Sequence, residues 1–230
     1  MTTGITTIYQ QLSDHFGPQH WWPGDTPLEI MVGAVLTQNT NWENVEKAIA
    51  NLKAANLLDL HRLAEIPTGT LAELIRPSGY YNLKAVRLHN LIRTITAEHD
   101  SLEGFFAADR YALREQLLAV KGIGPETADS ILLYGAGKAT FVIDAYTHRL
   151  LWRHGLIGEE TDYYEMQELF LSALPEDVAL FNEYHALIVR VGKEFCRKSK
   201  PRCRECPLRE LLPENAASNT DQHLDFSGQI

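Results

Sequence analysis

A short glycine turn is the first stretch of the sequence with a definite chemical capacity. Gly122 and Gly124 flank one isoleucine, and Pro125 follows in the run KGIGPETA. Glycine lets the backbone turn tightly and carries no Cβ that would keep a ligand away. Pro125 suits the first turn of a helix, where free N–H groups and the positive end of the dipole attract anions. The turn indicates an anion-binding site, although an ordinary connection between two helices could have the same residues.

Three cysteines form a second group with chemical capacity. Cys196, Cys203 and Cys206 are the whole cysteine content, and they follow the pattern C-x6-C-x2-C. Disulfides are not expected, because the number of cysteines is odd, no cysteine lies elsewhere in the chain to cross-link the fold, and the cytosol keeps thiols reduced. The spacing therefore indicates ligation of a metal or of an iron–sulfur cluster.

A basic segment surrounds these cysteines, in a chain whose formal net charge is −9. The overall charge argues against a general nucleic-acid binder, but a local patch can override it. A solvated surface run and a phosphate-binding patch both remain open. The segment's basic residues are Arg190, Lys193, Arg197, Lys198, Lys200, Arg202, Arg204 and Arg209, opposed by Glu194 and Glu205.

Composition limits the class of protein. The 230 residues are 45% hydrophobic and 22% charged, which suffices for one large domain or two small ones. No run of 18 apolar residues predicts a transmembrane helix. The start, MTTGITTIYQ, lacks the basic and then apolar pattern of a signal peptide, so we expect a cytoplasmic protein.

Helical periodicity dominates the chain and predicts an all-α fold. Residues 140–143 have β-like composition, but they are too few for a sheet and are expected to be extended chain leading to Asp144. The polar tail 213–230 is expected to be disordered. The expected helices span 5–16, 27–37, 42–55, 58–65, 69–75, 83–98, 102–107, 111–119, 126–134, 145–154, 163–173 and 178–195.

Three motifs together, VKGIGPETA, FVIDAYTHR and FCRKSKPRCRECP, resemble the endonuclease III, or helix-hairpin-helix-GPD, superfamily of DNA glycosylases. The resemblance covers roughly residues 20–212. It implies two helical lobes with DNA bound across the cleft between them. One lobe would combine residues 1–25 with 109–195, and the other would be a helical bundle over 26–108. A cysteine loop would span 196–212.

The resemblance assigns roles within the hairpin and just after it. The backbone N–H groups from Val120 to Gly124 would hold a DNA phosphate, with Thr127 also at the DNA, and this would position the protein without reading sequence. Asp144 matches the catalytic aspartate, which would stabilise the oxocarbenium-like sugar and orient water. A plain N-cap of the helix that begins at Ala145 is the alternative, and both roles are compatible.

Glu126 departs from the family pattern. Members that also cleave the backbone carry a lysine there, which attacks the sugar and forms a Schiff base. Glutamate cannot form an imine, so we predict a monofunctional glycosylase with weak AP lyase activity at most. Two alternatives stay open: a bifunctional enzyme that uses another amine, with Lys121 nearby on the hairpin, and a non-catalytic DNA-binding protein.

Two further residues match family positions that distort DNA. Gln38 would fill the gap left by the flipped base, and Tyr80 would wedge into the opposite strand. A polar residue at a helix C-terminus and a core tyrosine are the respective alternatives. Trp21, Trp22 and Trp42 could form an aromatic pocket. Core packing of the tryptophans is the alternative. The run Trp21-Trp22-Pro23, with LTQNT and RPSGYYN after it, resembles the branch of the family that includes the 3-methyladenine glycosylase of endonuclease III type, and this resemblance suggests alkylated purines as substrates.

The cysteine loop also departs from the family. The family pattern C-x6-C-x2-C-x5-C holds a [4Fe–4S] cluster, and here Leu212 stands in the fourth place. Either the cluster keeps a non-cysteine or open fourth site, or the loop has lost it; His223 is a poor substitute in the tail. The expected partner is double-stranded DNA with a damaged base, bound by a monomer that is nucleoid-associated when on DNA and does not bind membranes.

Overall fold

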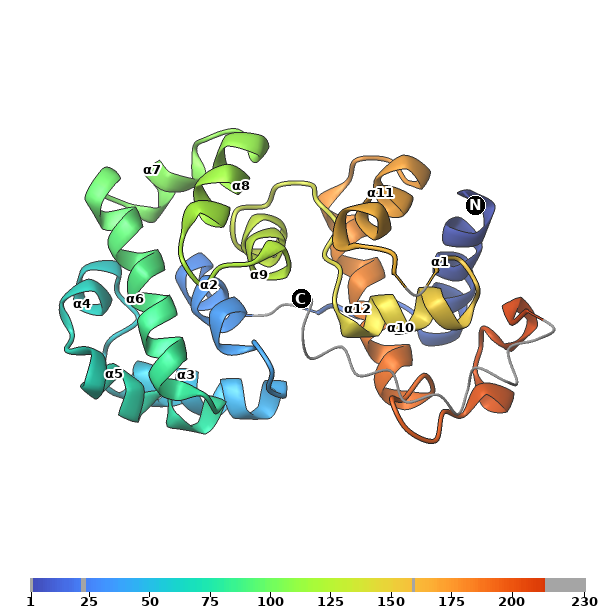
Figure 1. The fold of residues 1–230 in the computed structure, drawn as a ribbon, viewed down its shortest axis with the longest axis horizontal. Coiled ribbons are helices and arrows are strands. Elements are labelled where there is room, and N and C mark those ends of the chain that lie inside the picture. Colours follow the sequence, from blue (N-terminus) through green and yellow to red (C-terminus); the bar gives the residue numbers. More distant parts are fainter. Residues whose placement is uncertain (1, 22–23, 159, 214–230) are drawn as a thin grey trace. The chain divides into compact units, whose positions relative to one another are not determined.

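The computed structural model describes residues 2–21, 24–158 and 160–213, and within these ranges it contains helices and connecting chain but no strand (Figure 1). The helices of the first part of the chain are α1 (Thr2–Phe16), α2 (Pro27–Leu36), α3 (Trp42–Ala54), α4 (Leu60–Glu65), α5 (Thr68–Leu74), η1 (Arg76–Ser78), α6 (Tyr81–Glu98) and α7 (Leu102–Phe106). Those of the second part are α8 (Arg110–Ala119), α9 (Pro125–Ser130), η2 (Ile131–Gly135), α10 (Ala145–Arg153), α11 (Tyr163–Ala173), α12 (Val178–Glu194), η3 (Cys203–Glu205) and η4 (Arg209–Leu211).

The all-α prediction is confirmed, and most helix boundaries fall within a few residues of those expected from the sequence. Capping explains several starts. Thr26 accepts the N–H of Glu29 through its hydroxyl at 3.2 Å, and Pro27 opens α2. No helix in the described ranges combines the length and the apolar character required to span a membrane. The tail 214–230 lies outside the described residues, so its predicted disorder stays a prediction.

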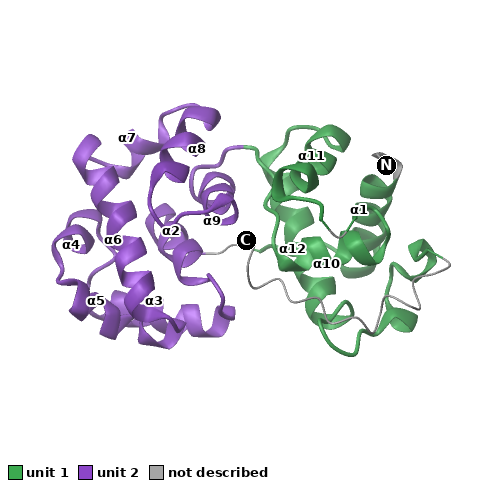
Figure 2. Ribbon diagram, viewed as in Figure 1, with its two compact units in different colours: residues 1–21, 139–230 green, residues 22–138 purple. Residues whose placement is uncertain are grey.

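The chain divides into two compact units (Figure 2). Unit 1 combines residues 1–21 with 139–230, and unit 2 spans residues 22–138. Helices α1, α10, α11 and α12 therefore belong to unit 1, and α2 to α9 with η2 belong to unit 2.

Unit 2 is built around α2, whose sequence PLEIMVGAVL is apolar on nearly every face. Helices that are apolar all round are buried, and here α3, α6, α9 and η2 surround α2. Its core contains Met31, Val32, Val35, Ile49, Leu52, Leu88, Leu91, Ile92, Leu113, Leu117, Ala128, Ile131 and Leu132.

Unit 1 is held together by aromatic packing. Phe141, from the extended segment before Asp144, stacks on Phe170 of α11 with ring centroids 3.8 Å apart. Tyr184 of α12 packs edge-on against both rings, and its hydroxyl donates to the carbonyl of Ile5 at 2.8 Å. The N-terminal helix is thereby fixed to the C-terminal half of the chain. Residues 140–143 are buried and belong to neither a helix nor a strand. This agrees with the prediction that they are extended chain, too short to form a sheet.

These two units divide the chain at other places than the expected lobes. The expected lobes put the glycine hairpin together with the N-terminal segment, whereas unit 2 extends to residue 138 and contains the hairpin. The physical reason is burial: Leu113 and Leu117 of α8 and Ala128 of α9 belong to the unit 2 core. Asp144 follows the boundary and lies in unit 1.

Candidate functional site

Asp144 is held at the N-terminus of α10 in unit 1. Its Oδ1 accepts the backbone N–H of Thr147 at 2.8 Å and the hydroxyl of Thr147 at 2.9 Å. This is the N-cap arrangement that the sequence offered as an alternative, and it fixes one carboxylate oxygen. The other oxygen, Oδ2, lies 3.4 Å from Nε2 of His185 on α12. The side chains of Asp144 and His185 are only 13% and 6% exposed, so their interaction is little screened by water.

The pKa of Asp144 lies below its ordinary value. Burial acts to raise it, but attraction to His185 and the hydrogen bonds from His185 and Thr147 outweigh burial. The carboxylate is therefore ionised at neutral pH although it is nearly covered. A fixed, ionised and poorly hydrated carboxylate is suited to stabilise positive charge that develops next to it.

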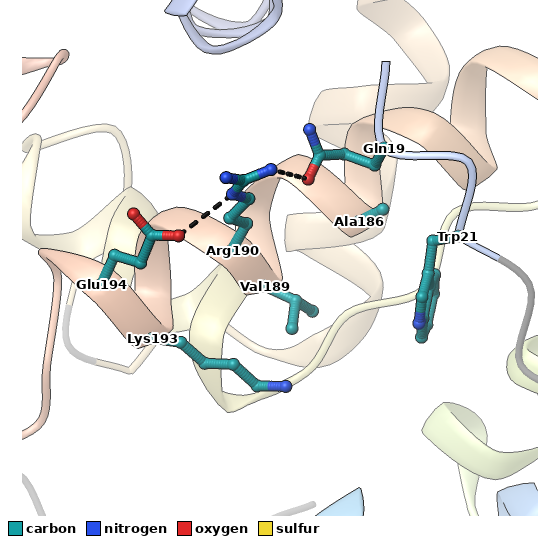
Figure 3. A pocket seen from close by; sticks show the side chains of 7 residues that line it. All are labelled: Gln19, Trp21, Ala186, Val189, Arg190, Lys193 and Glu194. Atoms are coloured by element: carbon teal, nitrogen blue, oxygen red, sulfur yellow. Dashed lines mark hydrogen bonds and ion pairs between the residues drawn. The ribbon is translucent and has the colours of Figure 1, made fainter. Parts of the chain in front are cut away.

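His185 did not emerge from the sequence. It stands among apolar residues on a buried helix, and only the packing of α10 against α12 brings it to Asp144. The rings of His185 and Trp21 lie 5.9 Å apart between centroids. Trp21 also lines an open pocket whose other walls come mainly from α12 (Figure 3). The pocket's other lining residues are Gln19, Ala186, Val189, Arg190, Lys193 and Glu194.

Arg190 lines this pocket, and two hydrogen bonds hold its guanidinium. Its Nε donates to Glu194 Oε1 and its Nη1 to Gln19 Oε1, each at 3.0 Å (Figure 3). Two other basic residues of the cysteine segment also pair locally, Arg202 with Glu205 and Arg209 with Glu210. These ion pairs partly neutralise the positive charge of the segment. Lys193 is also among the residues that line the pocket.

The glycine hairpin of unit 2 has the geometry that its sequence predicts. Gly122 has φ +100°, and a Cβ there would collide with the side chain of Arg87. Gly124 has φ −96°, and no atom of the described part of the chain lies within 4 Å of the position of a Cβ. Val120 is buried at the end of α8 and accepts the N–H of Ile123 at 3.0 Å. The fold thus requires glycine at 122 but not at 124, where open space faces the start of α9.

A buried ion pair braces the two helices of the hairpin. Arg114 of α8 makes two hydrogen bonds to Asp129 of α9, from Nε to Oδ1 at 2.8 Å and from Nη2 to Oδ2 at 2.9 Å. The Asp129 side chain is fully buried, so the parallel pair fixes the angle at which α9 leaves the turn. No local pattern in the sequence indicates this pair, because its members lie on either side of the turn.

Gln38 is brought to this hairpin from the end of α2. Its Nε2 donates to the Thr127 hydroxyl at 2.9 Å and to the Gly122 carbonyl at 3.3 Å. Its Oε1 accepts from Arg87. Gln38 thus lies just past the C-terminus of α2, which agrees with the alternative interpretation as a polar residue at a helix end. It also makes hydrogen bonds to two predicted DNA-binding residues, Gly122 and Thr127.

Glu126 occupies the first turn of α9, and its carbonyl accepts the Ser130 hydroxyl at 2.7 Å. The helix continues without interruption into the π-helical turn η2. Tyr80 is 71% exposed and adopts a left-handed backbone, φ 46° and ψ 29°, immediately before α6. The core interpretation of Tyr80 is therefore wrong, and its conformation is one that tyrosine adopts only when its surroundings impose it.

The three tryptophans considered as pocket walls are not gathered in one unit. Trp42 is half-buried against the unit 2 core and would contact a Cβ at Gly33. Trp21 belongs to unit 1, and Trp22 lies outside the described residues. Of the three, Trp21 is the one beside the Asp144–His185 pair.

The cysteines line one small apolar cavity in unit 1. Cys196 and Cys206 are buried, Cys203 is half-buried, and none forms a disulfide. Arg153 donates through Nη1 to the Cys196 sulfur at 3.3 Å. Leu212, in the family's fourth cysteine position, also lines the cavity. The remaining lining residues are Arg153, His154, Phe195 and Leu208.

These residues fit an iron–sulfur cluster better than a single ion. Among the described residues, no group of three or more His, Cys, Asp or Glu side chains surrounds the place of one metal ion. A cluster is larger, because each thiolate binds a different iron atom. Burial, together with the charges of the other two cysteines, raises the pKa of Cys206 to about 11. Three mutually interacting soft donors around one apolar cavity are the donor set that such a cluster needs.

Comparison with known proteins identifies relatives over most of the chain. Residues 32–176 match the family model described as HhH-GPD superfamily base excision DNA repair protein. A candidate DNA repair glycosylase of Methanocaldococcus jannaschii is 48% identical over 209 residues, which cover 90% of this chain and 94% of the relative. Endonuclease III of Thermotoga maritima is 30% identical over 192 residues, 80% of this chain and 81% of that protein.

Solved structures of DNA glycosylases are also similar to this chain. The H. pylori 3-methyladenine DNA glycosylase MagIII, bound to 1,N6-ethenoadenine, is 36% identical with a TM-score of 0.72, over 84% of this chain and 97% of that one. A non-covalent endonuclease III–DNA complex superposes with a TM-score of 0.80 over 96% of this chain and 99% of that one. Its 20% identity supports the shared fold.

Proposed function

The chain belongs to the HhH-GPD superfamily of base excision DNA repair proteins and is a DNA glycosylase, and we propose that it hydrolyses the N-glycosidic bond of a damaged base through Asp144 while sparing the strand. One observation carries the proposal. Asp144 is an ionised, nearly buried carboxylate with one oxygen fixed by Thr147 and the other facing His185.

The chemistry follows from this arrangement. As the bond to the base breaks, the sugar acquires oxocarbenium-like positive charge, which a nearby carboxylate stabilises most strongly where water is scarce. Because Thr147 already holds Oδ1, the carboxylate does not need to reorganise during the reaction. His185 positions Oδ2, and the carboxylate orients the water that attacks the sugar.

Glu126 supports a monofunctional enzyme. A lyase needs an amine that attacks the sugar carbon, and a glutamate in the first turn of α9 cannot form the imine. Lys121, the amine nearest in sequence, is exposed on the turn. Its own backbone carbonyl is tied to Asn90 Nδ2 at 2.9 Å. The alternative, a bifunctional enzyme that uses another amine, predicts a covalent adduct with DNA.

DNA is the expected partner of the hairpin. Because the fold does not require glycine at 124, we attribute that glycine to the close approach of a phosphate to the backbone N–H groups. Such contacts let an acidic chain bind DNA with few lysines, and Lys193 beside the Trp21 pocket would add a second phosphate contact. Gln38 and the exposed, strained Tyr80 are assigned the gap-filling and wedge roles.

Alkylated purines are the proposed substrate class. The MagIII structure, 36% identical, is that of a 3-methyladenine glycosylase with an ethenoadenine bound. Alkylated purines are electron-poor and leave readily, so they need stacking more than protonation of the leaving group. Trp21, whose ring lies next to His185, offers a stacking surface near Asp144.

We assign a [4Fe–4S] cluster to Cys196, Cys203 and Cys206. When bound, it supplies a rigid cross-link within the loop 196–212 and a one-electron redox centre. The chain's own residues prepare the loop for it: Arg153 holds the carbonyl of Arg197 at 2.8 Å and donates to the Cys196 sulfur. Arg149 Nε donates to the Cys196 carbonyl at 2.6 Å.

Single-turnover base release tests the proposal. Duplexes would each carry one alkylated, oxidised, deaminated or mismatched base, and released base would be quantified for the wild type and for Asp144→Asn. We expect release of alkylated purines by the wild type and loss of that release in the variant. Equal release by both proteins would support non-catalytic DNA binding instead.

Borohydride trapping on abasic DNA tests the monofunctional assignment. We expect no covalent adduct with the wild type. Glu126→Lys places an amine in the first turn of α9 and should generate an adduct, because lysine can form the reducible imine. Glu126→Gln is the matched control, equal in length but without an amine. An adduct with the wild type that disappears in Lys121→Arg would favour the bifunctional alternative.

A further inference from the structure

One histidine of unit 1 faces the cysteine cavity and has no role in the glycosylase chemistry. His154 ends α10 as its C-cap, far upstream of the cysteine loop in sequence, and lines the same cavity as the three cysteines. Its ring has two nitrogens with different surroundings. Nδ1 lies 2.8 Å from the backbone carbonyl of Leu150. Nε2 is buried and has no hydrogen-bond partner among the residues that the structure describes.

An unpartnered buried nitrogen is costly, because the ring has lost its contact with water without gaining another contact. The bond to Leu150 also fixes the tautomer, since a carbonyl accepts only from a protonated Nδ1. Nε2 therefore carries the lone pair. Histidines that ligate metals usually donate their other N–H to a backbone carbonyl or carboxylate in this way.

Leu212, in the fourth cysteine position, presents only hydrocarbon to the cavity and cannot supply a ligand.

We propose that Nε2 of His154 is the non-cysteine ligand of an iron–sulfur cluster held by Cys196, Cys203 and Cys206. The inference rests on the cluster assigned above. Three thiolates come from the loop, and the fourth donor comes from the end of α10. Replacing a thiolate with a neutral imidazole removes one negative charge, so the cluster's reduction potential is higher than with four cysteines.

The test is spectroscopic. Full-length protein is purified anaerobically, or reconstituted with iron and sulfide, and its reduced cluster is examined by pulsed electron paramagnetic resonance. We expect a strongly coupled nitrogen whose signal changes when histidine is labelled with ¹⁵N. The signal should vanish in His154→Ala. In His154→Cys the cluster should persist, without the nitrogen signal and with a lower reduction potential.

His89 provides the matched control. It is a buried histidine of unit 2 whose Nε2 also lacks a hydrogen-bond partner and whose Nδ1 lies 2.9 Å from the Thr68 hydroxyl. His89→Ala should retain the nitrogen signal and the iron content. If His154→Ala fails to fold, the labelled wild-type spectrum alone decides.

The outcomes separate the two proposals. Protein that contains iron and sulfide but shows no histidine nitrogen at the cluster overturns the His154 inference and leaves the cluster in place. Colourless protein without iron, even after reconstitution, overturns both. Neither result bears on base release by Asp144.

Discussion

At the scale of single residues, the site depends on one carboxylate whose surroundings decide its charge. Asp144 was recognisable from FVIDAYTHR, but its sequence neighbours do not explain why it stays ionised while nearly buried. Hydrogen bonds from Thr147 and attraction to His185 lower its pKa against the effect of burial. The carboxylate's capping role and its proposed catalytic role are compatible, because the cap at Oδ1 holds the whole carboxylate in place.

Asp144→Asn separates the two roles. Asparagine caps helices about as well as aspartate, so we expect the free energy of unfolding to change by less than about 1 kcal/mol. The charge is lost, and single-turnover base release should fall by at least about 100-fold. Release is measured on an alkylated duplex and stability by urea unfolding. Asp144→Ala, which also removes the cap, is the control and should be less stable than Asp144→Asn.

His185→Leu should change the pH dependence of base release. The pKa of Asp144 is lower in the folded protein than in the unfolded chain, where it is about 3.9. The ionised carboxylate therefore stabilises the folded protein above about pH 3.9, and this stabilisation is lost as the pH falls through the folded-state pKa. Without His185, burial dominates and the pKa rises. The acid limb of the rate profile should then move to higher pH. An unchanged acid limb would mean that His185 does not influence Asp144.

At the scale of elements, the hairpin is set by backbone geometry and by a buried brace. Gly122 adopts a positive φ that other residues rarely accept, and Arg87 occupies the space next to it. The Arg114–Asp129 pair then fixes α9 relative to α8. The N–H groups at the start of α9 are therefore pre-ordered before any ligand arrives.

The two glycines of the hairpin should respond differently to alanine. Gly122→Ala must shift Arg87 and strain the backbone, so we expect a loss of about 1–3 kcal/mol in the free energy of unfolding. Gly124→Ala has room for its Cβ and should leave stability nearly unchanged. It should weaken DNA binding about tenfold, or about 1.4 kcal/mol, because the methyl group stands where a phosphate approaches.

Urea unfolding and fluorescence anisotropy with a duplex measure these two effects. Normal DNA affinity in Gly124→Ala would contradict the phosphate role of the hairpin. A stable Gly122→Ala protein would show that Arg87 can move at little cost.

At the scale of the whole molecule, the chain begins in unit 1, passes through unit 2 and then returns to unit 1. The N-terminal helix α1 packs with α11 and α12, and the residues between them form unit 2. The predicted phosphate clamp lies in unit 2, whereas Asp144 and the cysteine cavity lie in unit 1. The run from Val120 to Asp144 is thus continuous in sequence but divided in structure.

Removal of the cluster should affect unit 1 selectively. The cysteines and His154 all belong to unit 1, and a ligand that binds only the native state stabilises it. After acid release and chelation of iron, amide exchange in residues 196–212 should accelerate at least about tenfold, or about 1.4 kcal/mol. Peptides of α2 and α6 should be unaffected. Equal acceleration in both units would indicate global unfolding instead.

The helical class, the glycine hairpin and the cysteine loop could be predicted from sequence patterns, and Asp144 from the resemblance of its motif to a known family. These signals are local: helical periodicity, a turn that needs glycine and fixed cysteine spacing all act between near neighbours along the chain. The sequence also shows directly that position 126 holds glutamate, where family members with lyase activity have lysine.

Which distant groups meet depends on tertiary packing. His185 reaches Asp144 because α12 packs on α10, and His154 reaches the cysteines because the loop folds back on the end of α10. The same burial of apolar faces moved the hairpin into unit 2. Contacts between residues far apart in sequence arise from packing that minimises exposed apolar surface, and no local pattern records which partners that packing will choose.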